Sequence, residues 1–519
     1  MRPGLRLCIL LAMLALASTL APTLHAQSVP HTLKIAIGTD PDTFDPAGQT
    51  TGLVMNMVGY LYERLVALDL KQNQVVPHLA TRWQVSADGL TYTFKLRSSV
   101  TFQDGAPLNA DAVKFTFDRL LDPKTRAPLR EPLMVIKETQ VIDDMTVRFL
   151  LSRPDPLFLT SLTHWVASIV SPSTTRRVGE NLGRDPTGSG TGPYMFKEWV
   201  RGSHILFVRN PNYWGRKPAF DEVMFRIAPD AGVRETMLLA GDVHMAVLPP
   251  APDVGRLRTH PGFRIVDAVA SRMIYIGMNT QWGPFKDVRV RQAVNYAVNK
   301  QALLAGIAFD LGTVADSPCV SMVSGYAPIQ SGGWPFNPSK ARQLLREAGY
   351  PDGFDVDFIT PTGRYIQDFQ VAQAITAELH NINVRANVRT MDWPTYLATV
   401  LQPSDRTSLQ MFLLAWVPFP LDCSAVLRPM FHPSQHPPQG LGATFYKNEK
   451  TDDLLERARG EMDESRRKEF LKEAQTLIWH DAPWIFLWSQ KWYVATVRNL
   501  EGVSITPFEM WDGVYATWK

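Results

Sequence analysis

The stretch GLTYTFKLRSSVTF, residues 89–102, alternates apolar and polar side chains in the manner of a β-strand buried on one face. Tyr92, Phe94 and Leu96 fall on the same face of this strand. An Asp-Gly pair at 88–89 supplies a turn before it. The stretch therefore predicts a half-buried strand that is preceded by a tight turn.

Strands and helices alternate along the rest of the chain. Residues 31–39, HTLKIAIGT, have the period of a strand, and TVRFLL and HILFVRN predict two more. Apolar residues at helical spacing predict helices, and the capping residues and prolines suit their ends, at 288–304, 337–350 and 463–483. Such interleaving indicates an α/β or α+β fold.

The N-terminus has the pattern of a secretory signal. Arg2 and Arg6 precede an almost wholly apolar run, residues 7–20, and Ala26 is the small residue after which cleavage is expected. The run is shorter than the ~20 apolar residues of a spanning helix. We therefore expect residues 1–26 to be a cleaved signal peptide and the mature protein to be periplasmic.

Size and charge narrow the class of protein further. The chain has 519 residues, more than the ~100–200 residues that one hydrophobic core usually organises, so two or three packed units are expected. The net charge of +3 includes the two arginines of the signal peptide, so the mature chain is near neutral. A nucleic-acid partner is not expected, because phosphate binding requires a concentrated basic surface.

Two cysteines, Cys319 and Cys423, remain after removal of the signal peptide. An oxidising compartment permits a disulfide between them. A buried free cysteine also behaves as a small apolar residue, and the sequence does not decide between the two states.

Motifs of catalysis are absent from the sequence. The Gly-rich run GSGTGP, residues 188–193, lacks the spacing of a dinucleotide fingerprint, and there is no Gly-x-Ser-x-Gly or His-Glu-x-x-His. His432 and His436 have the spacing of a metal pair on a helix, but the prolines around them favour a loop with solvent-facing imidazoles. The sequence predicts a protein that is not an enzyme and that holds no cofactor or metal.

Several long motifs, in order, resemble the extracytoplasmic solute-binding proteins of family 5, which serve dipeptide, oligopeptide and nickel ABC transporters. They are IGTDPDTFDPAG (37–48), the long stretch 77–120 with its Phe-x-Asp-Gly turn, GTGPYMFKEW (190–199), RNPNYWG (209–215), FKDVRVRQAVNYAVNK (285–300) and ARQLLREAGYPDGF (341–354). The resemblance covers nearly the whole mature chain. One departure is His244 in GDVHMAV, where relatives usually carry Asp. The turn motif at 210–215 is interpreted as structural, with Tyr213 and Trp214 in a core.

The resemblance implies an α/β, two-lobed periplasmic binding protein of the large class, whose lobes close about a hinge. It places lobe I in three segments, an inserted subdomain between them, and lobe II after them. The expected bounds are 27–64, 190–270 and 491–519 for lobe I, 65–189 for the inserted subdomain and 271–490 for lobe II.

The resemblance also suggests how a peptide would be held. It puts Asp422, after Trp416, where relatives bind the ligand's ammonium; the alternative is that Asp422 caps the turn into SAVLRPMF. It puts Arg364, followed by Tyr365, where relatives hold the ligand's carboxylate; the alternative is a solvated loop arginine. A guanidinium binds a carboxylate through two parallel hydrogen bonds, and an aromatic ring can wall the pocket. Trp416, Tyr365, Thr43 and Phe44 complete the expected ligand-binding set.

The function implied is that of the substrate-binding component of an ABC importer, a monomer that delivers a small peptide to permease and ATPase subunits in the inner membrane. Relatives of this fold bind different solutes, so glutathione, a nickel chelate, an opine or an oligosaccharide remain alternatives. An exported peptidase is the enzyme alternative. The identity and length of the solute are left open by the sequence.

Overall fold

The computed structural model describes residues 31–519 apart from residues 42, 49–51, 70–73, 126, 330–332, 363 and 392. The predicted signal peptide, residues 1–26, lies outside the described residues. Within the described part, no helix combines the length and the apolar character needed to cross a bilayer.

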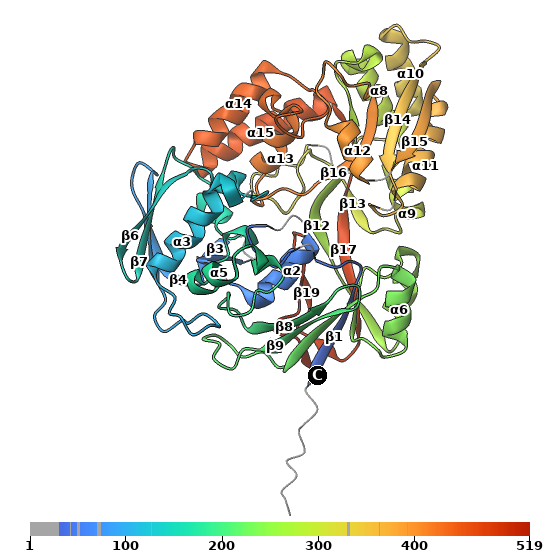
Figure 1. Cartoon of the computed structure of the whole chain (residues 1–519). Helices are drawn as coiled ribbons and strands as arrows, with labels where there is room; N and C mark the ends of the chain where they lie inside the picture. Colours follow the sequence, from blue (N-terminus) through green and yellow to red (C-terminus); the bar gives the residue numbers. More distant parts are fainter. Residues whose placement is uncertain are drawn as a thin grey trace, which may run out of the picture.

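One mixed sheet of eleven strands runs through the molecule (Figure 1). Its order is β15-β14-β16-β12-β17-β11-β1-β10-β9-β8, and β13 pairs with β17 beside this path. The strands are β1 (Thr32–Ile37), β8 (Tyr194–Val200), β9 (His204–Arg209), β10 (Glu222–Ile227), β11 (Met245–Val247), β12 (Phe263–Met278), β13 (Gly312–Val314), β14 (Phe354–Pro361), β15 (Val384–Met391), β16 (Met411–Trp416) and β17 (Trp484–Val497).

The two central strands, β12 and β17, join the halves of this sheet. They pair antiparallel from Phe263 opposite Val497 to Gly277 opposite Trp484. The register shifts between Val269 and Met273, which marks a β-bulge at the middle of β12. Figure 1 shows both strands crossing from the lower to the upper part of the molecule. The predicted lobe boundaries at 270/271 and 490/491 fall within these two strands, beside the bulge.

The first half of the sheet, β1 and β8–β11, packs against a few helices and an aromatic core. The helices are α2 (Gly52–Leu61), α6 (Ala231–Leu239) and α7 (Val254–Thr259). Tyr60 from α2 meets Phe225 edge to face, with ring centroids 5.6 Å apart, and Phe207 lies 5.3 Å from Phe225. Four short C-terminal strands adjoin this half: β18 (Leu500–Glu501), β19 (Ser504–Ile505), β20 (Trp511–Asp512) and β21 (Thr517–Trp518).

The second half of the sheet, β13–β16, carries most of the helices. They are α8 (Val288–Ala297), α9 (Lys300–Gly306), α10 (Pro338–Glu347), α11 (Asp368–His380), α12 (Trp393–Val400), α13 (Ser424–Phe431), α14 (Glu449–Gly460) and α15 (Glu464–Asp481). Figure 1 places α14 and α15 above the smaller sheet and α10 and α11 beside β14 and β15.

A separate four-stranded antiparallel sheet, β4-β5-β7-β6, forms a smaller unit. Its strands are β4 (Ala80–Val85), β5 (Thr91–Leu96), β6 (Ile136–Asp143) and β7 (Thr146–Leu151). The helices α3 (Ala110–Leu121), α4 (Phe158–Ser161) and α5 (Pro172–Val178) and the hairpin of β2 (Val66–Asp69) and β3 (Gln74–Pro77) complete this region. All of these elements lie within the predicted inserted subdomain, 65–189.

The strand predicted around residue 94 is confirmed, but it is shorter than the quoted stretch. Tyr92, Phe94 and Leu96 of β5 are buried on one face, as predicted. The strand ends at Leu96, and Ser99 adopts a positive φ of 63° that no regular strand allows. The second part of the stretch is therefore a turn rather than a continuation of the strand.

The predicted helices are confirmed with one break. The helix predicted over 288–304 is divided into α8 and α9, because Asn299 caps α9 by accepting a hydrogen bond from the Ala302 amide at 3.1 Å. The predicted helix at 463–483 is α15, which Asp463 caps at its start. Asn337 caps α10, and Gly349 follows its end with a φ of 88°.

Candidate functional site

A cavity of about 1290 Å³ lies where the two halves of the large sheet and the smaller unit face one another. Residues from all three regions line it, among them Arg64, Trp165, Tyr213, Tyr365, Trp416 and Asp512. Its wall is rich in aromatic side chains with a small number of charged groups, which is the usual composition of a small-molecule site. The volume exceeds the ~300–1,000 Å³ of most ligand pockets, so a solute of several residues fits.

Arg364, one of the residues expected to bind the ligand, lines the cavity. It is an exposed residue on the loop between β14 and α11, and its backbone amide donates to Asp368 Oδ2 at 2.8 Å. Desolvation by the surrounding wall, and then the charge of Arg272, lower the pKa of the Arg364 guanidinium. A carboxylate placed beside it would relieve that repulsion, because an anion favours the charged form of a cation.

Tyr365 and Trp416, two further residues of the expected ligand-binding set, also line the cavity. Tyr365 is buried, and the guanidinium carbons of Arg272 and Arg364 lie 5.5 and 5.4 Å from its ring centroid. Trp416 ends β16, and its indole Nε1 donates to the Ala425 carbonyl at 2.7 Å, which fixes the ring. Both rings contribute apolar surface to the cavity wall.

Asp422 does not reach the cavity, and its geometry argues against the predicted ammonium anchor. Only 1% of the residue is exposed, and Arg467 of α15 donates to both carboxylate oxygens, at 2.8 and 2.7 Å. Burial alone would lower the pKa of Arg467, but hydrogen bonds and charge from Asp422 outweigh it and raise that pKa. The carboxylate also accepts from the Ser424 amide at 2.9 Å, as the alternative interpretation, a turn cap, requires. Asp422 is therefore part of a buried ion pair.

Thr43 and Phe44 are not among the residues that line the cavity, although both were expected at the ligand site. The Thr43 hydroxyl accepts from the Asp45 amide at 3.0 Å and so stabilises its own loop. Phe44 is fully buried and meets Trp199 and Phe207 edge to face in the core of the first half. The aromatic side chain after the first strand serves packing.

An acid that the sequence did not single out, Asp512 of β20, lines the cavity. It is an exposed residue, and its Oδ1 accepts from the Val514 amide at 3.2 Å. Desolvation raises the pKa of Asp512, while the Val514 amide and the charge of Arg64 act in the opposite direction. Nothing in the local pattern around WDG distinguished this acid, because its neighbours in space come from distant parts of the chain.

Arg64, which follows the end of α2 at Leu61, is a second cavity residue missed by the sequence. Its guanidinium carbon lies 3.4 Å from the Trp165 ring centroid, and Nη1 donates to the Thr163 carbonyl at 2.5 Å. Desolvation lowers the pKa of Arg64 to about 9, against the opposing charges of Glu63 and Asp512. Arg64 is thus a cation held on an aromatic face in a poorly solvated place.

Three other charged side chains of the wall, Arg272, Arg234 and Glu63, are satisfied within the protein. Arg272, at the bulge of β12, forms a two-armed ion pair with Glu509. Arg234 donates to four backbone carbonyls, at 2.7 to 2.8 Å. Glu63 accepts from Thr191, Tyr213 and Trp214 at 2.7 to 2.8 Å. These groups shape the wall, and Arg64, Arg364 and Asp512 are further charged side chains that line the cavity. Tyr213 lines the cavity and also bonds to Glu63, so it serves both wall and core.

The structure pairs Cys319 with Cys423 as a disulfide, with Cα atoms 5.8 Å apart, in the core of the second half. It thereby favours the bridged alternative. His432 and His436 flank a short 3-10 turn, Pro433–Gln435, and are half-buried rather than solvent-facing. The His436 Nε2 atom lies 2.9 Å from the Tyr446 carbonyl oxygen. Among the described residues, no cluster of three potential metal ligands is found.

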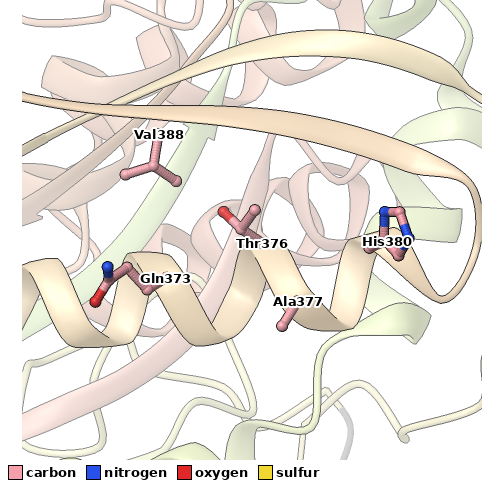
Figure 2. A pocket seen from close by; sticks show the side chains of 5 residues that line it. All are labelled: Gln373, Thr376, Ala377, His380 and Val388. Atoms are coloured by element: carbon pink, nitrogen blue, oxygen red, sulfur yellow. The ribbon is translucent and has the colours of Figure 1, made fainter.

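A second, shallow depression lies on the outer face of α11 beside the edge strand β15 (Figure 2). Gln373, Thr376, Ala377 and His380 from the helix and Val388 from the strand line it. It brings no charged pair together, and we assign no function to it.

Comparisons with known proteins agree with this architecture. The model of the bacterial extracellular solute-binding proteins, family 5, matches residues 74–437. The glutathione-binding protein GsiB of Salmonella typhimurium is 33% identical over 505 residues, 96% of each chain. The corresponding protein of Pectobacterium atrosepticum is 31% identical over 475 residues, 91% of each chain.

Solved structures show the same two-lobed fold. HbpA2 from Haemophilus parasuis superposes with a TM-score of 0.83 and 28% identity, covering 94% of this chain and all of its own. The dipeptide-binding protein from Pseudoalteromonas sp. SM9913, in complex with Met-Leu, gives a TM-score of 0.80 and 25% identity over 94% of this chain and 100% of its own. The chain therefore belongs to the bacterial extracellular solute-binding proteins of family 5, with their mixed α/β, two-lobed fold.

Proposed function

We propose that this protein is the periplasmic substrate-binding component of an ABC importer and that it captures a short peptide or peptide-like solute in the 1290 Å³ cavity. The observation that carries the proposal is that Arg364 and Asp512, groups of opposite charge from different halves of the molecule, line this one cavity. A peptide with free ends presents a carboxylate and an ammonium, so it can bridge both groups.

The proposed lobes follow the strands of the large sheet. Lobe I comprises 27–64, 190–270 and 491–519, lobe II comprises 271–490, and 65–189 is the inserted subdomain. The bulge in β12 supports a hinge there, because its residues leave the ladder and contact the C-terminal loop instead. The Ser271 amide and hydroxyl donate to the Pro507 carbonyl at 2.7 and 2.8 Å. Closure about β12 and β17 would bring Arg364 and Asp512 onto the ligand.

Export and delivery complete the proposal. The signal pattern of residues 1–26 supports cleavage and a periplasmic location, and the family match supports permease and ATPase subunits as partners. A monomer suffices, because all groups of the proposed site come from one chain. Among peptide-like solutes, glutathione stands first, since relatives 31 to 33% identical are named glutathione-binding proteins.

Isothermal titration calorimetry of the purified mature protein tests this function. We expect saturable binding of reduced glutathione, and of short peptides with free ends, without any change in the recovered solute. N-acetylated and C-amidated versions of the same peptides should bind at least about tenfold more weakly, because each lacks one of the two ligand charges that the wall groups attract. Binding only of an oligosaccharide or a nickel chelate, or hydrolysis of the peptide, would contradict the proposal.

A further inference from the structure

Arg64 and Asp512 both belong to the cavity wall, and they form no ion pair with each other. Both line the cavity, and each charge acts on the pKa of the other. No salt bridge within 4.0 Å joins them among the described residues. A ligand group that carries both an ammonium and a carboxylate can therefore bind between this cation and this anion.

Both side chains are held in place by α2 and its neighbours. The Asn56 side chain of α2 accepts from the Trp511 amide at 2.7 Å, which fixes β20 and hence Asp512. Arg64 follows the same helix and lies on the Trp165 ring. Because these contacts involve α2, the smaller unit and β20 but no element of lobe II, the spacing of the two groups should not depend on how far the two lobes have closed.

Each group has hydrogen-bonding capacity to spare. Arg64 uses Nη1 on Thr163, while Nε is buried without a partner among the described residues, and Nη2 bonds to none of them. Asp512 uses Oδ1 for the Val514 amide, and its other oxygen has no protein partner in the described part of the chain. A buried donor without a partner costs free energy, which a ligand carboxylate would recover.

We infer that Arg64 and Asp512 together bind an intact α-amino-acid head group, with Arg64 on its carboxylate and Asp512 on its ammonium, and that Arg364 binds a second carboxylate across the cavity. This inference rests on the proposed function and makes it more specific. An ordinary α-peptide has no carbon that carries both a free ammonium and a free carboxylate. A γ-glutamyl peptide has one, because its peptide bond starts from the side-chain carboxyl. Such a site favours γ-linked peptides over α-linked ones.

The test compares two isomers of equal composition and charge, γ-Glu-Cys-Gly and α-Glu-Cys-Gly, by calorimetry at fixed salt and pH under reducing buffer that leaves the buried disulfide intact. The wild type should bind the γ-isomer about tenfold or more tightly, because in the α-isomer the free carboxylate lies farther from the ammonium and leaves Arg64 or Asp512 unpaired. Arg64→Gln and Asp512→Asn should each weaken the γ-isomer and bring the ratio of the two affinities close to one.

Arg364→Gln is the matched control within the site, because it should weaken both isomers and preserve their ratio. Asp512→Glu and Arg64→Lys, which keep the charges, should retain part of the preference, and melting temperatures show that each variant is folded. Equal binding of the isomers by the wild type, or a ratio that survives both Arg64→Gln and Asp512→Asn, overturns the inference and leaves the peptide receptor standing. If neither isomer nor any short peptide binds, the proposed function itself fails, and the head-group site fails with it.

Discussion

At the scale of single residues, Asp422 and Arg364 show how a side chain's partners decide its role. Both are ionic side chains that the sequence connected with the ends of a peptide. Arg467 occupies both oxygens of Asp422 inside the protein, whereas Arg364 is exposed on the cavity wall. One ionic side chain is therefore neutralised inside the fold, and the other lines the cavity.

Replacing Arg364 by Gln should weaken peptide binding by about 10- to 100-fold, since each factor of ten corresponds to about 1.4 kcal/mol and truncation of one charge of a desolvated pair costs that much or more. Calorimetry with a peptide that has free ends measures the change. Arg389→Gln is the matched control, because Arg389 lies in the same half but pairs with Asp357 at 2.7 Å on the surface. A loss of equal size in the two variants would show that Arg364 has no specific place in the site.

Replacing Asp422 by Asn should destabilise the fold and leave the peptide affinity of the folded protein nearly unchanged. It leaves Arg467 buried and unpaired, which typically costs about 3–5 kcal/mol of unfolding free energy. The double variant Asp422→Leu with Arg467→Met should recover much of that loss, because two apolar residues need no charged partner. Urea unfolding measures both, with the exposed Asp357→Asn as control. An unchanged midpoint together with lost peptide binding would restore the ammonium-anchor interpretation.

At the scale of secondary-structure elements, the short 3-10 helix Trp165–Ala167 ties the smaller unit to the second half. His164 caps it through Nδ1, which accepts from the Val166 amide at 3.0 Å. The same imidazole lies 3.9 Å from the ring of Phe419, which in turn lies 5.6 Å from Phe508. One buried, neutral histidine therefore caps an element and packs against the loop after β16.

Acid should weaken the fold through His164. Desolvation, and then the charge of Arg64, lower the pKa of His164 from 6.5 to about 3. A lowered histidine pKa means that the unfolded chain binds the proton first, so stability is lost as pH falls from 6.5 towards 3. At about pH 4.5, protonation of one such histidine in the unfolded chain lowers the free energy of unfolding by roughly 2–3 kcal/mol.

The variant His164→Asn tests this pH-dependent loss of stability, because Asn keeps an acceptor for the cap and does not titrate. The melting temperatures of wild type and variant should converge as the pH falls from 7 to 4.5. Only the wild type loses stability in acid through a buried neutral imidazole. Other histidines with lowered pKa, such as His244 and His432, are present in both proteins and cancel in the difference. Parallel pH profiles of the two proteins would exclude His164 as an acid-sensitive group.

At the scale of the whole molecule, the sequence predicted the fold far better than the site. Strand and helix periods are local, and long ordered motifs identify an architecture, so β5, α10 and α15 appeared near their predicted positions. Which acid faces the cavity depends on pairings between distant segments: Arg467 is 45 residues from Asp422 and neutralises it. Arg64 and Asp512 line the same cavity because α2 is hydrogen-bonded to β20, near the end of the chain. No local pattern carries that information.

The central claim is that two lobes close over a peptide-like solute about β12 and β17. Small-angle X-ray scattering of the mature protein with and without a saturating peptide ligand tests it most directly, with Arg364→Gln at the same ligand concentration as a weak-binding control. We expect a smaller radius of gyration with ligand in the wild type and a smaller change in the variant. An unchanged radius of gyration in wild type that calorimetry shows to be saturated would contradict the closing mechanism.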